Sequence, residues 1–113
     1  MFDSVSSVAL HSALDGLSLR SRVIADNVAN INTPGFLAGQ VTFEESLRTA
    51  VGGGSGTATA SVYRTGGATR EDGNNVDLDE QTLQGIETQM RYQLITQAVT
   101  NQHSLISASL RTS

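Results

Sequence analysis

The side chains that most often bind metals or carry out catalysis are few in this chain. Its only histidines are His11 and His103, and none of its 113 residues is a cysteine. Two imidazoles without a thiolate or an ordered carboxylate beside them make a poor metal site, even where an antiparallel pair of helices brings them close. We therefore expect surface or interhelical histidines, and the sequence predicts no metal and no cofactor.

Other segments that resemble known sites lack a required part. One acidic cluster has part of the spacing of a calcium loop, but Val76 and Asp77 stand where a ligand and a glycine are needed. Its members are better explained as turn and capping residues: Asp72, Asn74, Asp77 and Asp79. The glycine-rich run at 52–56 is not followed by the Lys-Ser or Lys-Thr of a phosphate-binding loop. No serine stands in a nucleophile motif with a paired base, so the chain is not expected to be an enzyme.

The most specific local pattern is a corner, the run from Asn27 to Phe36. Asn27 and Asn30 lie near the end of a predicted helix, where an asparagine lowers helix propensity. The two share one helical face, so we expect their amides to point in one direction toward specific partners. A single asparagine there would more often be solvated. These two precede a turn that stops the helix, which favours a structured contact; the turn consists of Thr33, Pro34, Gly35 and Phe36.

Two long helices are predicted on either side of the middle of the chain. The first runs from about Val5 to Ile31, and its apolar residues have the spacing of a coiled-coil seam: Leu10, Leu14, Leu17, Ile24, Val28 and Ile31. The second runs from about Asp79 to Leu110, and its apolar stripe begins with Leu83, Ile86, Met90 and Leu94. Amides beside that stripe, Gln93 and Gln97 among them, are expected to set the register of helix packing.

The predicted fold is therefore mainly α, with the two terminal helices paired as an antiparallel coiled-coil-like hairpin. Four parts make up one assembly domain. Residues 1–36 hold the first helix and the corner, 37–51 a short amphipathic helix, 52–75 a flexible segment rich in Gly, Ser and Thr, and 76–113 the second helix. A short β-hairpin in the flexible segment is a further possibility upon assembly.

The short helix carries two signals of its own. Thr42 and Glu45 have the spacing of a capping box at its start. Phe43 and Leu47 lie four residues apart and so share one face. The simpler interpretation of this pair is the buried side of an amphipathic helix.

The corner and a second segment resemble the bacterial flagellar axial proteins, the subunits of the rod and the hook. In that family the N-terminal helix ends in two asparagines, a threonine, a glycine and an aromatic residue, which stand here between Asn27 and Phe36. The run from Asp72 to Asp79, followed by Gln89 to Gln93, is similar to the C-terminal signature of the proximal-rod subgroup. The chain is also about as short as members of that subgroup, and the resemblance leaves its middle unexplained.

The resemblance implies a structural subunit of the flagellar basal body that self-assembles through its terminal helices and serves motility. Its implied partners are other rod subunits, the basal-body junction protein and, transiently, the export gate. The family pattern of a phenylalanine followed four residues later by an apolar residue implies that Phe43 and Leu47 contribute to recognition by that gate. The implied location is the periplasmic rod, reached by type III export without a cleaved signal peptide.

Composition agrees with a chain that needs partners. Aromatic residues make up only 4% and tryptophan is absent, which is little material for a core of its own. The net charge of −4 and the lack of lysine argue against nucleic acid or an anionic membrane as the ligand, and no membrane insertion is expected. The alternative function is a cytoplasmic helical-hairpin adaptor or chaperone of flagellar export, which would have the same amphipathic helices but no need for the corner.

Overall fold

The computed structural model describes residues 4–112, so the acidic start Met1-Phe2-Asp3, from which the lack of a signal peptide is predicted, lies outside it. The elements in chain order are α1 (Val5–Ala29), β1 (Gly39–Thr42), α2 (Glu44–Gly52), β2 (Ser61–Arg64) and α3 (Leu78–Thr112). The two long helices confirm the predicted fold class.

Both long helices begin at side-chain caps. The hydroxyl of Ser4 accepts a hydrogen bond from the backbone N–H of Ser7 at 3.1 Å. The carboxylate of Asp77, one of the two predicted caps of α3, accepts from the N–H groups of Asp79 at 2.9 Å and Glu80 at 3.4 Å. Each cap satisfies N–H groups that have no partner inside the helix, which fixes where the helix starts.

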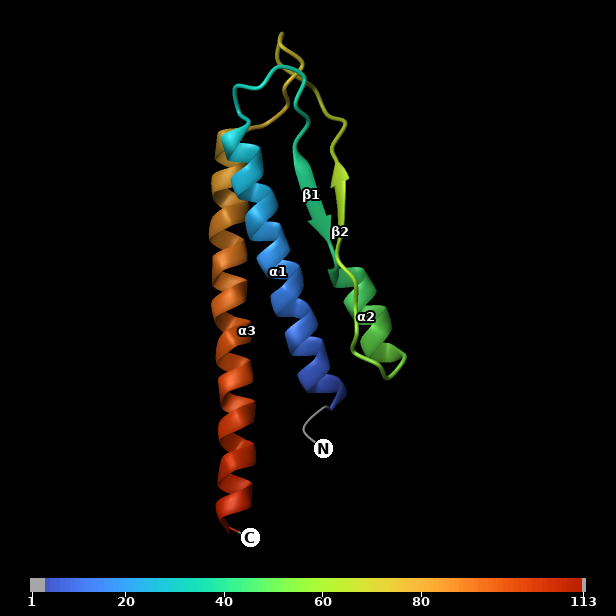
Figure 1. Cartoon of the computed structure of the whole chain (residues 1–113), viewed down its shortest axis with the longest axis vertical. Coiled ribbons are helices and arrows are strands. Elements are labelled where there is room, and N and C mark those ends of the chain that lie inside the picture. Colours follow the sequence, from blue (N-terminus) through green and yellow to red (C-terminus); the bar gives the residue numbers. More distant parts are fainter. Residues whose placement is uncertain (1–3, 113) are drawn as a thin grey trace.

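The elements form a single layer (Figure 1). Helix α1 lies in the middle, α3 runs antiparallel along one side of it, and the two strands and α2 form a strip along the other side. The Cα atoms extend over 66 × 25 × 14 Å, so the molecule is a thin slab. Because a single layer has two open broad faces, it cannot bury an ordinary two-layer core by itself.

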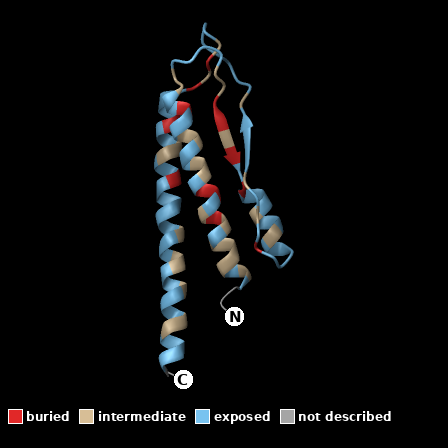
Figure 2. Ribbon diagram, in the orientation of Figure 1, coloured by how far each residue is buried: buried red, intermediate tan, exposed pale blue. Residues whose placement is uncertain are grey.

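The small core lies where α1, β1 and the start of α2 meet. Its buried members are Ala13, Leu17, Val41 and Phe43, with Leu47 and Ile95 among the residues packed against them. Most of α3 is exposed along its length (Figure 2). Burial of Phe43 and partial burial of Leu47 confirm the interpretation of this pair as the inner face of α2.

The strands come from two segments for which the sequence predicts other structure. β1 and β2 pair antiparallel, with Gly39 opposite Arg64 and Val41 opposite Val62. The sequence predicts only a helix in 37–51 and, at most, a hairpin inside 52–75, whereas each segment contributes one strand. Both strands have four residues, and their stability comes from pairing across the chain and from packing on α1, neither of which local patterning reveals.

The predicted capping box of α2 is wrong. Thr42 is the last residue of β1, Phe43 occupies the N-cap position, and no side chain of that residue caps the helix. The carboxylate that folds back belongs to Glu44, whose Oε1 accepts from the N–H of Phe43 at 3.4 Å. Glu45 instead forms an exposed ion pair with Arg48. The strand therefore continues through the position that the capping box would occupy.

The face of α3 that contacts α1 is also not the predicted one. Leu83, Ile86, Met90 and Leu94, called the α3 stripe below, are 55–62% exposed within the chain. The buried positions of the upper part of α3 are polar, Gln81 and Thr88, and Gly85 lies against Ile24. On the α1 side Leu17 is buried, Leu10, Leu14, Ile24 and Ile31 are half-buried, and Val28 is exposed. The helix pair is thus joined by small and polar residues of α3, while its most apolar row faces outward.

A close approach at Gly16 gives the first prediction. A Cβ atom at this position would lie 2.5 Å from the Cγ and Cδ1 atoms of the Phe43 ring. Gly16→Ala gains about 1 kcal/mol of helix propensity, but overpacking costs about 1–3 kcal/mol. Because neither the buried ring nor α1 has room to move aside, we expect net destabilisation of about 1–2 kcal/mol in urea unfolding followed by circular dichroism.

Gly52→Ala is the matched control, because Gly52 is also helical and nothing lies within 4 Å of its added Cβ. It should leave stability unchanged or raise it slightly. Equal effects of the two substitutions would show that the Phe43 contact does not restrict position 16.

Candidate functional site

Asn27 joins three elements at the upper end of the helix pair. Its side chain is fully buried, its Oδ1 accepts from the N–H of Gly39 at 2.8 Å, and its Nδ2 donates to the carbonyl of Gly39 at 2.9 Å. The same Nδ2 donates to Oε1 of Gln81 at 2.9 Å. An amide on α1 therefore binds the start of β1 as a neighbouring strand would and fixes the register of α3 at one position.

Asn30 has a different role from Asn27, so the expectation that both amides point toward common partners is wrong. The Nδ2 of Asn30 donates to the carbonyl of Asp26 at 2.8 Å, and its Oδ1 accepts from the hydroxyl of Thr33 at 3.0 Å. These bonds close the end of α1, where Asn30 is the C-cap. The difference arises because α1 ends at Ala29, so Asn30 lies beyond the regular helix.

The loop before α3 locks the turn of the corner. Asn74 is fully buried, and its Nδ2 donates to the carbonyls of Asn30 and Thr33 at 2.8 and 2.9 Å. The N–H of Gly35 donates to the carbonyl of Asp72 at 2.8 Å. Gly35 has a φ of +75°, a conformation that favours glycine. The two segments that carry the family resemblance are thus hydrogen-bonded to each other at one end of the molecule.

Asn75 and two arginines complete this lock. Asn75 accepts from the N–H of Ala38 at 2.7 Å and donates to the carbonyl and hydroxyl of Thr65. Arg70 donates to the carbonyls of Ile31 and Val76. Arg64 lies over the ring of Phe36, with its Cζ 5.0 Å from the ring centroid. The segment 52–75, which the sequence predicts to be flexible, therefore holds both a strand and the residues that fasten the corner.

Sequence reasoning missed Gln81, Asn74 and Asn75 as site residues. The signal for Gln81 is that it continues, at heptad spacing, the row of Thr88 and Ile95, which is less apolar than the α3 stripe but faces α1. The signal for Asn74 and Asn75 is a pair of adjacent amides after a glycine with positive φ, Gly73. Gln93 and Gln97, predicted to set register, are exposed within the chain.

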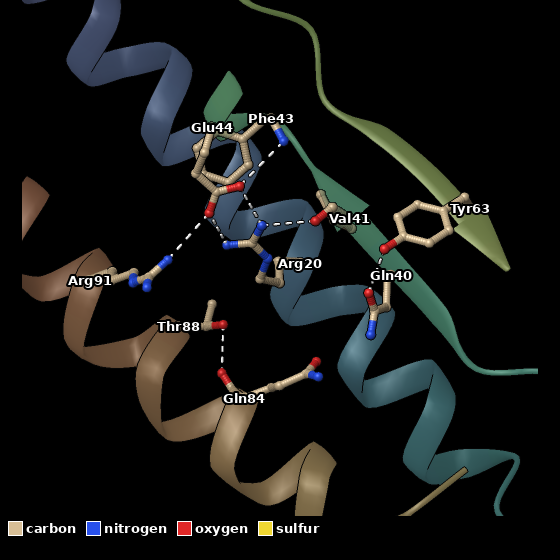
Figure 3. Close-up of polar contacts among 9 residues, drawn as sticks. All are labelled: Arg20, Gln40, Val41, Phe43, Glu44, Tyr63, Gln84, Thr88 and Arg91. Atoms are coloured by element: carbon tan, nitrogen blue, oxygen red, sulfur yellow. Dashed lines mark hydrogen bonds and ion pairs between the residues drawn. The ribbon is translucent and has the colours of Figure 1, made fainter. Parts of the chain in front are cut away.

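Glu44 is the centre of an ionic cluster that connects α1, α2 and α3 (Figure 3). Arg20 donates to both carboxylate oxygens of Glu44 at 2.7 Å and to the carbonyl of Val41 at 2.8 Å. Arg91 of α3 lies 3.3 Å from the same carboxylate. Arg20 also lies over the Phe43 ring, 4.9 Å from its centroid. The hydrogen bonds donated by Arg20 hold the pKa of Glu44 at about 2, below its ordinary value of 4.5.

This cluster predicts a pH-dependent contribution to stability. Because the pKa is lower in the folded chain, the contribution is present above pH 4.5 and disappears as the pH falls toward 2. The Glu44 side chain is 46% exposed, so solvent screening limits the effect of Glu44→Gln to about 1 kcal/mol at pH 7. Urea midpoints of wild type and variant should converge between pH 4.5 and pH 2. Glu45→Gln, at an exposed neighbouring carboxylate, should change little, and a constant difference across this pH range would contradict the prediction.

The outward face of α3 is the largest unpartnered apolar feature near these residues. The α3 stripe lies on the side of α3 opposite Gln81 and Thr88, and it extends about 16 Å at the usual rise of about 1.5 Å per residue. An apolar row that faces water while polar residues face the partner helix inverts the usual pattern of an amphipathic helix. Such a surface is typical of a protein that binds another macromolecule.

The histidines lie where the predicted antiparallel pairing brings them. His11 and His103 both line a groove of about 360 Å³ between α1 and α3. Within residues 4–112 there is no cluster of three or more His, Cys, Asp or Glu side chains suited to a metal. In the same part of the chain, none of the helices combines the length and the apolar character needed to cross a membrane.

Comparison with known proteins identifies the family. A family model described as a flagella basal body rod protein matches residues 9–36, which include the corner. The flagellar basal body rod protein FlgB of Borrelia hermsii is 34% identical over 110 residues, covering 76% of this chain and 81% of the relative. FlgB of Bacillus subtilis is 25% identical over 115 residues, covering 89% of each chain. FlgB of Salmonella typhimurium is 29% identical over 111 residues, covering 76% of this chain and 80% of the relative. The chain therefore belongs to the FlgB family of flagellar basal body rod proteins.

Proposed function

We propose that this chain is a structural subunit of the proximal rod that assembles with other rod subunits through its terminal helices. The observation that supports the proposal most directly is the α3 stripe, since four apolar residues face outward on a helix whose inner face is polar. Full burial of one such side chain contributes about 1.5–3 kcal/mol. A slab with a small core gains more from contacts with neighbouring subunits than it can gain alone.

Each part of the chain has a place in this function. Leu10, Leu14, Leu17, Ile24, Val28 and Ile31 hold or extend the helix pair, and the stripe provides the surface toward neighbouring subunits. The corner and its lock set the angle between the helix pair and the strand strip, and Gln93 and Gln97 flank the stripe and would set the register between subunits. Repeated contacts between unlike surfaces generate helical tubes. Neighbours would be the other rod proteins and the basal-body junction protein.

Delivery to the rod would use type III export without a cleaved signal peptide. Phe43 and Leu47 remain the proposed contacts with the export gate. Phe43 is only 4% exposed, and its ring is enclosed by Gly16 and Arg20. Recognition of Phe43 would therefore have to precede folding or require local unfolding of the contact between α1 and α2.

Deletion of the gene in its native host tests the proposal. Loss of swimming, with isolated basal bodies that have membrane rings but no rod, is the expected result, and re-expression of the wild-type chain should restore both. Normal rods in the deletion strain would rule out the structural role. Fewer rods of normal composition would instead support a cytoplasmic adaptor or chaperone.

A further inference from the structure

We propose that an apolar socket between α1, α2 and α3 binds the α3 stripe of a second copy of this chain. This inference rests on the assembly function proposed above and identifies the surface that receives the stripe. The socket is a cavity of about 240 Å³ whose accessible wall is apolar. Its apolar lining comes from all three helices and the residue before α2: Ala13, Leu17, Phe43, Leu47, Leu94 and Ile95.

The socket is preformed. Its floor consists of buried core residues, Leu17 and Phe43, which are 2% and 4% exposed. The ring of Phe43 is held between Gly16 and the guanidinium of Arg20. The ion pair between Glu44 and Arg91 connects α2 to α3 beside the cavity, so the two walls are tied together (Figure 3). A preformed site loses little conformational entropy when it is filled.

The size and chemistry of the socket suit side chains of the stripe. An apolar cavity of about 150 Å³ can hold a benzene molecule, so this cavity has room for a leucine, isoleucine or methionine side chain. The centre of the stripe offers Ile86 and Met90, which are 55% and 57% exposed. Burial of these side chains in an apolar wall removes two exposed surfaces from water at once.

Charge selects a second copy as the occupant and orients it. Arg48 follows the socket residue Leu47 on α2 and is 79% exposed, and its ion pair with Glu45 spans one helical turn in solvent. Exposed pairs of this kind contribute little, so Arg48 can exchange its partner. Glu87 is exposed beside Ile86 and Met90 on the stripe. Docking the stripe in the socket of another copy brings the carboxylate of Glu87 toward the guanidinium of Arg48.

This contact is heterologous, because stripe and socket are different surfaces of the same chain. Each docking event leaves one free stripe and one free socket, so the contact propagates instead of closing into a dimer. That property is the one required of a subunit in an extended helical array.

Disulfide cross-linking tests the proposal, since the chain has no cysteine of its own. Met90→Cys and Leu47→Cys are made in separate full-length chains, mixed and oxidised, so that a bond between positions 90 and 47 can form only between two copies. We expect this mixed disulfide to be the main product, at least tenfold above the yield in urea. Ser18→Cys, which lines a different groove between α1 and α3, should give no such product with Met90→Cys.

Every other product would overturn the proposal. A disulfide between two copies of Met90→Cys would show that stripes pair with each other, and one between positions 90 and 18 would place the stripe in the other groove. Both results would leave the rod function intact while rejecting the socket. No cross-link above the yield in urea, at any protein concentration, would reject docking between copies of this chain.

A charge exchange provides an independent readout. Glu87→Arg in the chain that carries Met90→Cys should lower the yield of the mixed disulfide severalfold. Arg48→Glu in the chain that carries Leu47→Cys should restore it. Absence of rescue would contradict the proposed orientation of the two copies.

Discussion

Replacement of Asn27 with leucine should lower the free energy of unfolding by about 2–4 kcal/mol. The substitution leaves the N–H and carbonyl of Gly39 without their partner in a buried site, and each unsatisfied buried group costs about 1–3 kcal/mol. It also removes the hydrogen bond to Gln81, which connects α1 to α3. Urea unfolding followed by circular dichroism measures the loss. The amide matters more than the space it fills, because leucine has nearly the same size.

Two further substitutions separate the role of the buried amide from that of the corner as a whole. Asn27→Asp keeps the acceptor for the N–H of Gly39 but places a carboxylate beside two acceptor oxygens, so it should be at least as harmful as leucine at pH 7. Asn30→Ala removes local bonds at a more exposed site and should cost about 1 kcal/mol or less. Similar losses for Asn27→Leu and Asn30→Ala would show that Asn27 has no special role in joining the three elements.

A charge in the centre of the α3 stripe should abolish assembly without unfolding the chain. Ile86→Glu and Met90→Glu replace residues that are more than half exposed, so the stability of the isolated chain should change by less than about 0.5 kcal/mol. In the rod, the same carboxylate would be buried in an apolar contact without a partner, which is strongly unfavourable. Expressed in the deletion strain, both variants should give non-motile cells whose basal bodies lack a rod.

Thr96→Glu is the matched control for the stripe. It places the same charge on α3, but position 96 is six residues from Met90 and, at about 100° per residue, points to a different side of the helix. Cells that carry it should swim. Motility with Met90→Glu at wild-type level would show that the stripe is not an assembly surface, and equal loss with Thr96→Glu would show that the effect is not specific to it.

The sequence predicts the helices well because their signals are local. The spacing of Leu10, Leu14 and Leu17 and the cap at Asp77 depend only on residues within one or two turns. The corner was also readable from sequence, since Pro34 and Gly35 restrict the backbone whatever lies around them. In contrast, β1 and β2 have four residues each and depend on each other and on α1, so neither segment has a strong pattern of its own.

The identity of the inner face of α3 could not be predicted from hydrophobicity, because the more apolar row is not the one that contacts α1. Gln81 and Thr88 can be buried because their polar atoms find partners: Gln81 bonds to Asn27, and Thr88 bonds to the carbonyl of Gln84 at 2.7 Å. In an ordinary monomer Leu83 and Met90 would take those positions. The inversion becomes reasonable for a chain that completes its core with neighbouring subunits.

The most direct test is a cryo-electron microscopy structure of the rod in basal bodies isolated from the native host, at a resolution that shows side chains. We predict that Leu83, Ile86, Met90 and Leu94 of this chain are buried against a neighbouring subunit while Gln81 still contacts Asn27 within the chain. A rod that contains the chain with these four side chains open to solvent would contradict the account. So would a complete rod from which the chain is absent.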